Sequence, residues 1–288
     1  MKYQFVTENQ GSFPASRICQ ALKVSASGYY RWVTRIPSPR ATENGKLLER
    51  IQTIHQETDE TYGSPRITVS LRDEGFKVSR PRIARMMRKH GILAKTHRKF
   101  KVTTDSDHDF PISPDLLNRN FSVDQPVKIW TSDITYIATL EGWLYLTVVE
   151  DLFNREIVGW SMSDSLKASE TTIPALIQAC CRFKPDPGLI FHSDRGVQYA
   201  CHSFREHLSN YQMKQSMSGK GNCFDNAVTE SFFATLKKDL IYRRRLMTKR
   251  EARQAIFKYI EVFYNRKRKH SKIGNMSPVQ LRSQRKAA

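Results

Sequence analysis

The chain has 288 residues, of which 39% are apolar, and a formal net charge of +19. No stretch approaches the roughly 18 consecutive apolar residues that a membrane span requires, and the N-terminus lacks the apolar core of a signal peptide. The five cysteines form no Cys-x-x-Cys pair, so neither a zinc ribbon nor a redox motif is indicated. These features exclude a membrane protein and predict a soluble, cytoplasmic protein of two or three domains with reduced thiols.

The net charge is unevenly distributed along the chain. Residues 1–120 have a net charge of +9, residues 121–230 of −4, and residues 231–288 of +14. Cations at both ends would neutralise phosphates, while carboxylates in the middle would hold a metal, as an enzyme acting on a polyanion requires. Solubility alone is the alternative, but 17 cationic residues in the last segment exceed what solubility needs. Nucleic acid is therefore the predicted partner.

Residues 1–40 are predicted to form a helix-turn-helix-like segment, with a tight turn near residues 23–26. Four side chains would form its small core: Ile18, Leu22, Val24 and Tyr30. Three side chains of the second helix would be available to DNA: Ser27, Tyr29 and Arg31. A plain helical hairpin is the alternative, because two packed helices of this length occur in many proteins.

Residues 43–100 are predicted to form a second helical, DNA-binding domain. Ser64 and Pro65 fit the N-cap and first position of one helix, which Gly75 ends, and Ser79 and Gly91 fit the two ends of the next. Three cations of that last helix share one outer face and form a predicted DNA-contacting surface: Arg82, Arg85 and Lys89. A solvated charged face is the alternative.

Residues 101–123, rich in Asp, Ser, Thr and Pro, are predicted to be a linker. Beyond it, the pattern in residues 124–240 predicts three strands, a helix, a strand, a helix, a strand and a long helix. A meander followed by crossover helices implies an α/β domain with a mixed five-stranded sheet and flanking helices. Residues 241–288 are predicted to be a basic, helical tail.

Three carboxylates in apolar surroundings are the candidate catalytic residues. Asp133 lies in the first predicted strand, Asp194 at the C-terminal end of a buried strand, and Glu230 on the long helix. A site that holds divalent metals for phosphodiester chemistry needs several oxygen ligands from different segments, and these three residues supply them. Each also has a structural interpretation: a strand-end hydrogen-bonding group, a turn former and a first-turn helix charge.

Neighbouring residues have predicted supporting roles. Lys237 lies two turns beyond Glu230 on the same helix face, so a phosphate-contacting cation would point into the same groove. His192 precedes Asp194 by two residues, and Asn226 is expected to cap the long helix together with Asp225. Two further acids at the turn after the second strand are expected to be structural: Glu150 and Asp151.

The strings around these acids, WTSDITYI, FHSDRGVQY and DNAVTESFFATLK, resemble the integrase core of bacterial insertion-sequence transposases. The resemblance is to the second-reading-frame (OrfB) protein of the IS-three family, and it extends to YGSPRI upstream and YNRKRKH downstream. It implies a ribonuclease-H-like core with Asp133, Asp194 and Glu230 as a metal-binding DDE triad, and Lys237 as a contact to the element's end. The paired His and paired Cys of the zinc-binding domain in retroviral integrases are missing, so zinc is not expected.

The resemblance also implies the cofactor, the partners and the location. The cofactor would be Mg²⁺, which Mn²⁺ can replace, with two ions at the site. The partners would be double-stranded DNA, as terminal inverted repeats and as target, and further copies of the chain when two ends are joined. A first-frame protein or a fusion with it is a further expected partner, and the location would be the bacterial nucleoid.

The predicted reaction is metal-dependent phosphoryl transfer: strand cleavage at the element's ends, then attack of the freed 3′-OH on another phosphodiester. Two alternatives stay open. One is a ribonuclease-H-like nuclease without strand transfer, and the other is a DNA-binding regulator with an inactive core.

Overall fold

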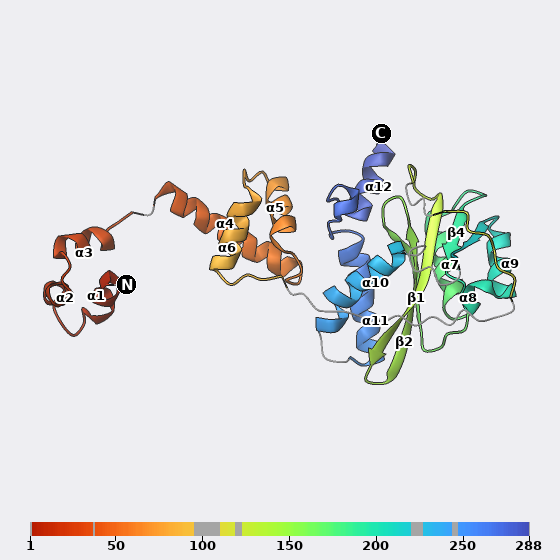
Figure 1. Cartoon of the computed structure of the whole chain (residues 1–288), viewed down its shortest axis with the longest axis horizontal. Coiled ribbons are helices and arrows are strands. Elements are labelled where there is room, and N and C mark those ends of the chain that lie inside the picture. The colour runs from red at the N-terminus through yellow and green to blue at the C-terminus, as the bar shows by residue number, and fades with distance from the viewer. Residues whose placement is uncertain are drawn as a thin grey trace. The chain divides into compact units, whose positions relative to one another are not determined.

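A computed structural model describes residues 2–36, 38–94, 110–118, 123–219, 227–243 and 247–287 (Figure 1). Asp225 and Asn226, predicted to cap the long helix, and most of the predicted linker 101–123 lie outside these residues. The chain divides into two compact units, residues 1–53 and residues 54–288. Within the described residues, no helix is long and apolar enough to cross a membrane.

The first unit contains three short helices, α1 (Lys2–Asn9), α2 (Ala15–Ala21) and α3 (Ala26–Val33). Ser25 begins α3 by accepting a hydrogen bond from the backbone N–H of Gly28 at 3.2 Å. The small core consists of four buried side chains: Val6, Ile18, Cys19 and Tyr29.

The predicted core of this unit was partly wrong. Ile18 is buried, and Leu22 and Val24 are packed against the core, but Tyr30 is 55% exposed. Tyr29, predicted to face DNA, is buried instead, and its ring lies against Tyr3 of α1 at a centroid distance of 6.1 Å. The reason is α1, which was not predicted from the sequence and which covers the side of α3 that Tyr29 occupies.

Helix α4 (Pro39–Glu57) crosses from the first unit into the second, where α5 (Ser64–Asp73) and α6 (Arg80–Lys89) follow. The N-cap of α5 is Gly63, so Ser64 is already helical and the predicted boundary was wrong by one residue. Ser79 is the N-cap of α6 as predicted. Gly75 and Gly91 follow the two helices with φ of +88° and +66°, the left-handed conformation that favours glycine at helix ends.

Five strands of the described chain form one sheet with the order β3-β2-β1-β4-β5. Their bounds are β1 Ile129–Thr139, β2 Gly142–Asp151, β3 Ile157–Ser163, β4 Ile190–Ser193 and β5 Lys214–Met217. The first three strands are antiparallel neighbours, whereas β4 pairs parallel with β1, and β5 pairs parallel with β4. The predicted mixed five-stranded sheet is confirmed.

Helices cover both faces of this sheet, and each face has its own apolar core (Figure 1). Helices α7 (Thr172–Phe183), α8 (Val197–Ala200) and α9 (His202–Asn210) cover the face that contains Trp130 and Phe191. Helices α10 (Ala227–Asp239) and α11 (Lys249–Lys258) cover the opposite face, which contains Ile137 and Val148. The second face is the one on which Asp133 lies, because strand side chains alternate.

The C-terminal segment continues the cover of that second face. Helix α11 begins with a capping box of Thr248 and Glu251 and runs directly into a π-helical stretch, η3 (Tyr259–Tyr264). Short 3₁₀ turns lie before and after these helices, η2 (Ile241–Arg243) and η4 (Ser271–Ile273), and α12 (Pro278–Ala287) ends the described chain.

Candidate active site

Two of the three candidate acids lie side by side at one strand edge. Residues 129–131 of β1 pair in parallel with residues 190–192 of β4. Two residues further along each strand, this register brings Asp133 next to Asp194, with both side chains on the sheet face that α10 covers. Beyond this point β4 ends, and β1 continues beside β2 alone as far as Thr139. The acids thus lie at the C-terminal end of β4, where the pairing of β1 with β4 ends within the described part of the chain.

Asp194 also shapes the turn that follows its strand. Its Oδ1 atom accepts a hydrogen bond from the backbone N–H of Gly196 at 2.9 Å, and Arg195 donates from Nε to the carbonyl of Ser218 at 2.7 Å. A Cβ atom on Gly196 would lie 2.9 Å from that same Oδ1 atom. Asp194 is therefore a turn former, as one of its two interpretations predicted, and the turn fixes the direction of its carboxylate.

Glu230 reaches the same face from α10. A hydrogen bond of 2.9 Å between the buried hydroxyls of Thr229 and Thr131 joins the first turn of this helix to β1. Thr131 and Asp133 are two residues apart on one strand face, and Thr229 precedes Glu230. This contact was not predicted from the sequence: alternation gives the direction of Thr131, but no local pattern identifies a partner 98 residues away.

Asp194 and Glu230 both act electrostatically on Asp133. Burial raises the pKa of Asp133 well above its usual range, and the nearby charges of Asp194 and Glu230 raise it further. The backbone N–H of Ile134, which donates to Asp133 Oδ1 at 2.8 Å, and the charge of Lys237 oppose this rise. The pKa of Glu230 is also raised, by burial. Negative charge is therefore crowded here, and a cation would relieve the repulsion.

Lys237 is a cation of α10 that acts on this cluster, and it is 5% exposed. Burial lowers the pKa of Lys237 to about 8, while the charge of Asp133 favours its protonated form. Lys237 thus interacts with Asp133 from the same helix that contains Glu230.

The donor set fits a divalent metal, since all three groups are carboxylates and hard cations prefer oxygen ligands. Among the described residues, no group of three or more His, Cys, Asp or Glu side chains is placed so that it could hold a metal ion.

The remaining predicted site residues differ in their placement. His192 is fully buried on β4, and its Nδ1 atom lies 2.9 Å from the hydroxyl of Ser216 on β5, so it supports the strand that ends one residue before Asp194. Arg85 and Lys89 lie on α6, as does Arg82, and Arg31 is exposed on α3 in the first unit. Asn226 lies outside the described residues.

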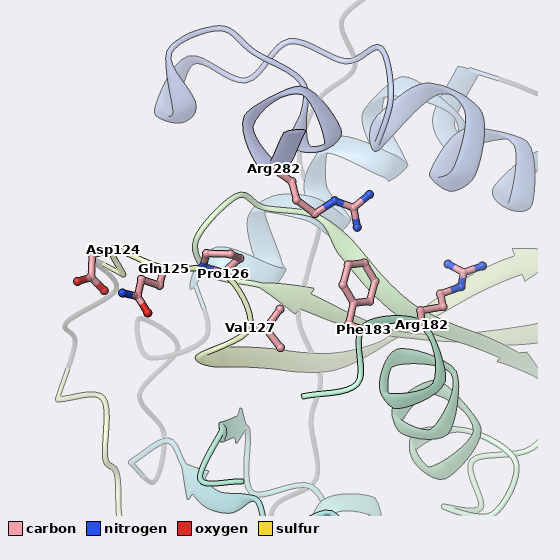
Figure 2. A pocket seen from close by; sticks show the side chains of 7 residues that line it. All are labelled: Asp124, Gln125, Pro126, Val127, Arg182, Phe183 and Arg282. Carbon is pink, nitrogen blue, oxygen red and sulfur yellow. The ribbon is translucent and has the colours of Figure 1, made fainter. Parts of the chain in front are cut away.

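A pocket of about 350 Å³ lies away from the acids, at the start of β1 and the end of α7 (Figure 2). Its lining includes Arg182, Phe183 and Arg282, and the guanidinium of Arg282 lies 5.0 Å from the centre of the Phe183 ring. Both arginines already have carboxylate partners, Glu261 at 2.7 Å and Glu156 at 3.3 Å. The charges at this pocket therefore serve the packing of the C-terminal segment.

Comparisons with known proteins agree with this architecture. Residues 123–223 and residues 230–285 both match families described as Integrase core domain, and residues 43–100 match a family described as HTH-like domain. The transposase InsF of insertion sequence IS3A from Escherichia coli (strain K12) is 37% identical over 285 residues, which cover 98% of each chain. The chain belongs to the IS3 family of insertion-sequence transposases.

A second relative of this IS3-family transposase is an uncharacterized 31 kDa protein of insertion element IS600 from Shigella sonnei. It is 43% identical over 265 residues, which cover 92% of this chain and 97% of that protein. Among solved structures, the catalytic core of HTLV-2 integrase in complex with magnesium is 20% identical, with a TM-score of 0.42. It covers 54% of the transposase and 95% of that chain. The resemblance and the integrase-core fold predicted from the sequence are confirmed by the family matches.

Proposed function

We propose that this transposase cuts DNA at the ends of an insertion element and joins the freed ends to other DNA, with Asp133, Asp194 and Glu230 as its catalytic triad. The observation that supports the proposal most strongly is the convergence of these acids from β1, from the end of β4 and from α10 on one sheet face. Among the described residues, β1 pairs with β4 only over residues 129–131, so the acids lie just beyond the last paired residues of these two strands.

The reaction has two steps. Water attacks a phosphodiester at the element's end, the bond to the 3′ oxygen breaks, and that oxygen leaves as a 3′-OH. The 3′-OH then attacks a phosphodiester of a second strand, forming a new P–O bond and releasing another 3′-OH. The neighbouring hydroxyls of Ser132 and Tyr199 are 2.8 Å apart and hydrogen-bonded to each other on the opposite sheet face. These two hydroxyls do not face the acids, and the proposal contains no covalent link between DNA and the protein.

The three carboxylates would hold Mg²⁺, or Mn²⁺ in its place, as two ions. When bound, the ions would activate the attacking oxygen and stabilise the leaving one. The protein's own groups orient the site: the turn at Gly196 directs Asp194, the threonine pair fixes α10 against β1, and Lys237 balances part of the negative charge.

Replacing Asp194 by Asn tests the triad. We expect Mg²⁺-dependent nicking of DNA that contains the element's ends to fall at least about a thousandfold, because the metal contributes several kcal/mol to the barrier. Asp186→Asn is the matched control, since Asp186 is 86% exposed and its ion pair is with the surface cation Lys128. Equal activity of the Asp194→Asn and Asp186→Asn variants would overturn the assignment.

The products separate the alternatives. An end substrate with a free 3′-OH should yield recombinant joined strands, whereas cleavage without joining would indicate a nuclease. Absence of any nicking by the wild-type chain, with DNA binding retained, would indicate a regulator with an inactive core.

We infer that DNA is bound on several surfaces: near the triad, where the nearly buried Lys237 adds positive charge, on α6 through Arg82, Arg85 and Lys89, and in the first unit through Arg31. Joining two ends brings together two bound chains, so the active form is a homo-oligomer. The first-frame protein, alone or fused to this chain, is proposed as a further partner. An oligomer on end DNA in sedimentation experiments would support this part of the proposal.

A further inference from the structure

A buried ion pair holds the C-terminal end of the helix that contributes Glu230. The Nε atom of Arg268 donates to Oδ2 of Asp239, the last residue of α10, at 3.0 Å. The hydroxyl of Tyr259 donates to that same oxygen, also at 3.0 Å. Each side chain of the ion pair is only 8% exposed. Buried ion pairs contribute little net stability, because desolvation offsets their attraction, but removing one partner costs several kcal/mol. The pair therefore fixes the position of residue 268 relative to the end of α10, whatever its net contribution to stability.

The same C-terminal segment holds α10 at a second point, close to Glu230. The ring of Tyr264 meets the ring of Phe232 edge to face, at 4.7 Å and 86°. The guanidinium of Arg268 lies 6.0 Å from the centre of the Tyr264 ring. Phe232 is two residues from Glu230, so the contacts of this segment span α10 from its catalytic residue to its end.

The HTH-like region reaches this segment through Tyr62, which lies between α4 and α5 and is 1% exposed. Its hydroxyl accepts a hydrogen bond from the backbone N–H of Lys269 at 2.8 Å and donates one to the carbonyl of Lys267 at 3.3 Å. These two bonds hold the backbone on both sides of Arg268. An ion pair between Lys269 and Asp73 of α5 reinforces the contact.

We propose that Tyr62, Arg268 and Asp239 are positioning residues that couple the HTH-like region to the catalytic helix. Tyr62 fixes the backbone from which Arg268 extends, Arg268 fixes the end of α10 through Asp239, and α10 holds Glu230 and Lys237 in place. Docking of the HTH-like region thereby sets the geometry of the triad. The part of this inference that concerns catalysis rests on the proposed function.

Hydrogen exchange tests the coupling without any measurement of activity. In the full-length chain, Tyr62→Phe removes one hydroxyl and leaves the ring in place. We expect backbone amides of residues 259–270 and of α10 to exchange severalfold faster than in the wild type, with α7 unchanged. Tyr211→Phe is the matched control, because Tyr211 packs against the core on the opposite sheet face. Faster exchange confined to amides near residue 62 in the sequence, with residues 259–270 and α10 unchanged, would overturn the coupling.

Kinetics tests the positioning of the triad. We expect Asp239→Asn and Arg268→Gln each to lower kcat about ten- to a hundredfold, since small displacements of catalytic groups have effects of this size. KM for DNA should stay within about twofold, and the Mg²⁺ concentration for half-maximal rate should rise. The double variant should lose little more than either single variant, because both remove the same contact.

Two outcomes are distinguished by this design. If the variants lose stability but their kcat per folded molecule equals that of the wild type, the ion pair is purely structural and the proposal is wrong. If the wild-type chain itself shows no Mg²⁺-dependent cleavage, the proposed function fails, and the exchange experiment still decides the coupling.

Discussion

At the scale of single residues, Glu150 shows how burial alone changes a carboxyl group. It lies on β2 opposite Thr131, is 1% exposed, and its Oε2 atom has no hydrogen-bond partner among the described residues. Burial raises the pKa of Glu150 to about 8, Asp151 adds to the rise, and Arg155 opposes it. The neutral acid is therefore the form that the fold accommodates near neutral pH, which is consistent with a structural residue.

Glu150→Gln should change how stability depends on pH. In the wild type, the unfolded chain ionises this group near pH 4.5 and the folded chain near pH 8, so the folded state binds the proton more tightly. Its contribution to stability is therefore complete below pH 4.5 and is lost as pH rises to 8. The difference in free energy of unfolding between the variant and the wild type should therefore shift by a few kcal/mol in favour of the variant between pH 4.5 and pH 8.

Urea unfolding of both proteins at several pH values between about 4.5 and 9 measures this difference, and other titrating groups cancel in the comparison. Asp164→Asn is a useful control: its ion pairs with Lys249 and Arg253 are on the surface, and they lower the pKa of Asp164. A constant offset between the Glu150→Gln variant and the wild type across this range would contradict the assignment.

The residue scale also shows what the sequence could predict. Alternation along a strand placed Asp133 on the face of Thr131, and the ends of apolar runs placed Asp194 at a strand end, because both patterns are local. The predicted burial of Tyr29 and Tyr30 was reversed: Tyr30 was expected in the core and Tyr29 on the surface. Which of the two is buried depends on helix α1, whose apolar pattern is weak. Local periodicity gives the face of a residue only when the covering element is known.

At the scale of elements, Gly159 of β3 shows how closely α7 packs on the sheet. A Cβ atom at this position would lie 2.8 Å from the Cβ of Ala179 and would also collide with the carbonyl oxygen of Ala175. Both contacts belong to the helix, whose backbone cannot move without shifting its whole length. The absent side chain therefore sets the distance between helix and strand.

Gly159→Ala should lower the free energy of unfolding by about 1–3 kcal/mol through overpacking. Thermal unfolding followed by circular dichroism would show a Tm lower by about 2–4 °C per kcal/mol in a unit of this size. Gly11→Ala is the matched control, because nothing lies within 4 Å of a Cβ atom there. An unchanged Tm for the Gly159→Ala variant would mean that α7 can shift freely.

Elements were predicted better than their connections. The five strands and the order of helices in the core followed from periodicity, because each strand or helix is a local pattern. The Thr131–Thr229 contact and the Tyr62 contact to residues 267 and 269 join segments far apart in sequence. Such contacts depend on the complete fold, so no local pattern predicts them.

At the scale of the whole molecule, net charge overstates the cations available to DNA. In the last segment, with its net charge of +14, several cations already contact carboxylates: Lys249 and Arg253 pair with Asp164, and Arg268 pairs with Asp239. Lys89 on α6, in contrast, is exposed, and the structure records no carboxylate partner for it among the described residues. For DNA binding, the position of each cation should therefore matter more than the number of cations in a segment.

Comparing Lys89→Ala with Lys249→Ala separates these two effects, because each removes one positive charge. If Lys89 contacts a phosphate, its loss should weaken binding to any duplex and reduce the slope of log K against log salt concentration by about 1. Lys249 lies 3.1 Å from Asp164, so its loss should leave the slope nearly unchanged. Fluorescence anisotropy of a labelled duplex across a series of KCl concentrations measures both slopes. Equal changes in the two variants would show that net charge governs binding and that α6 is no specific DNA surface.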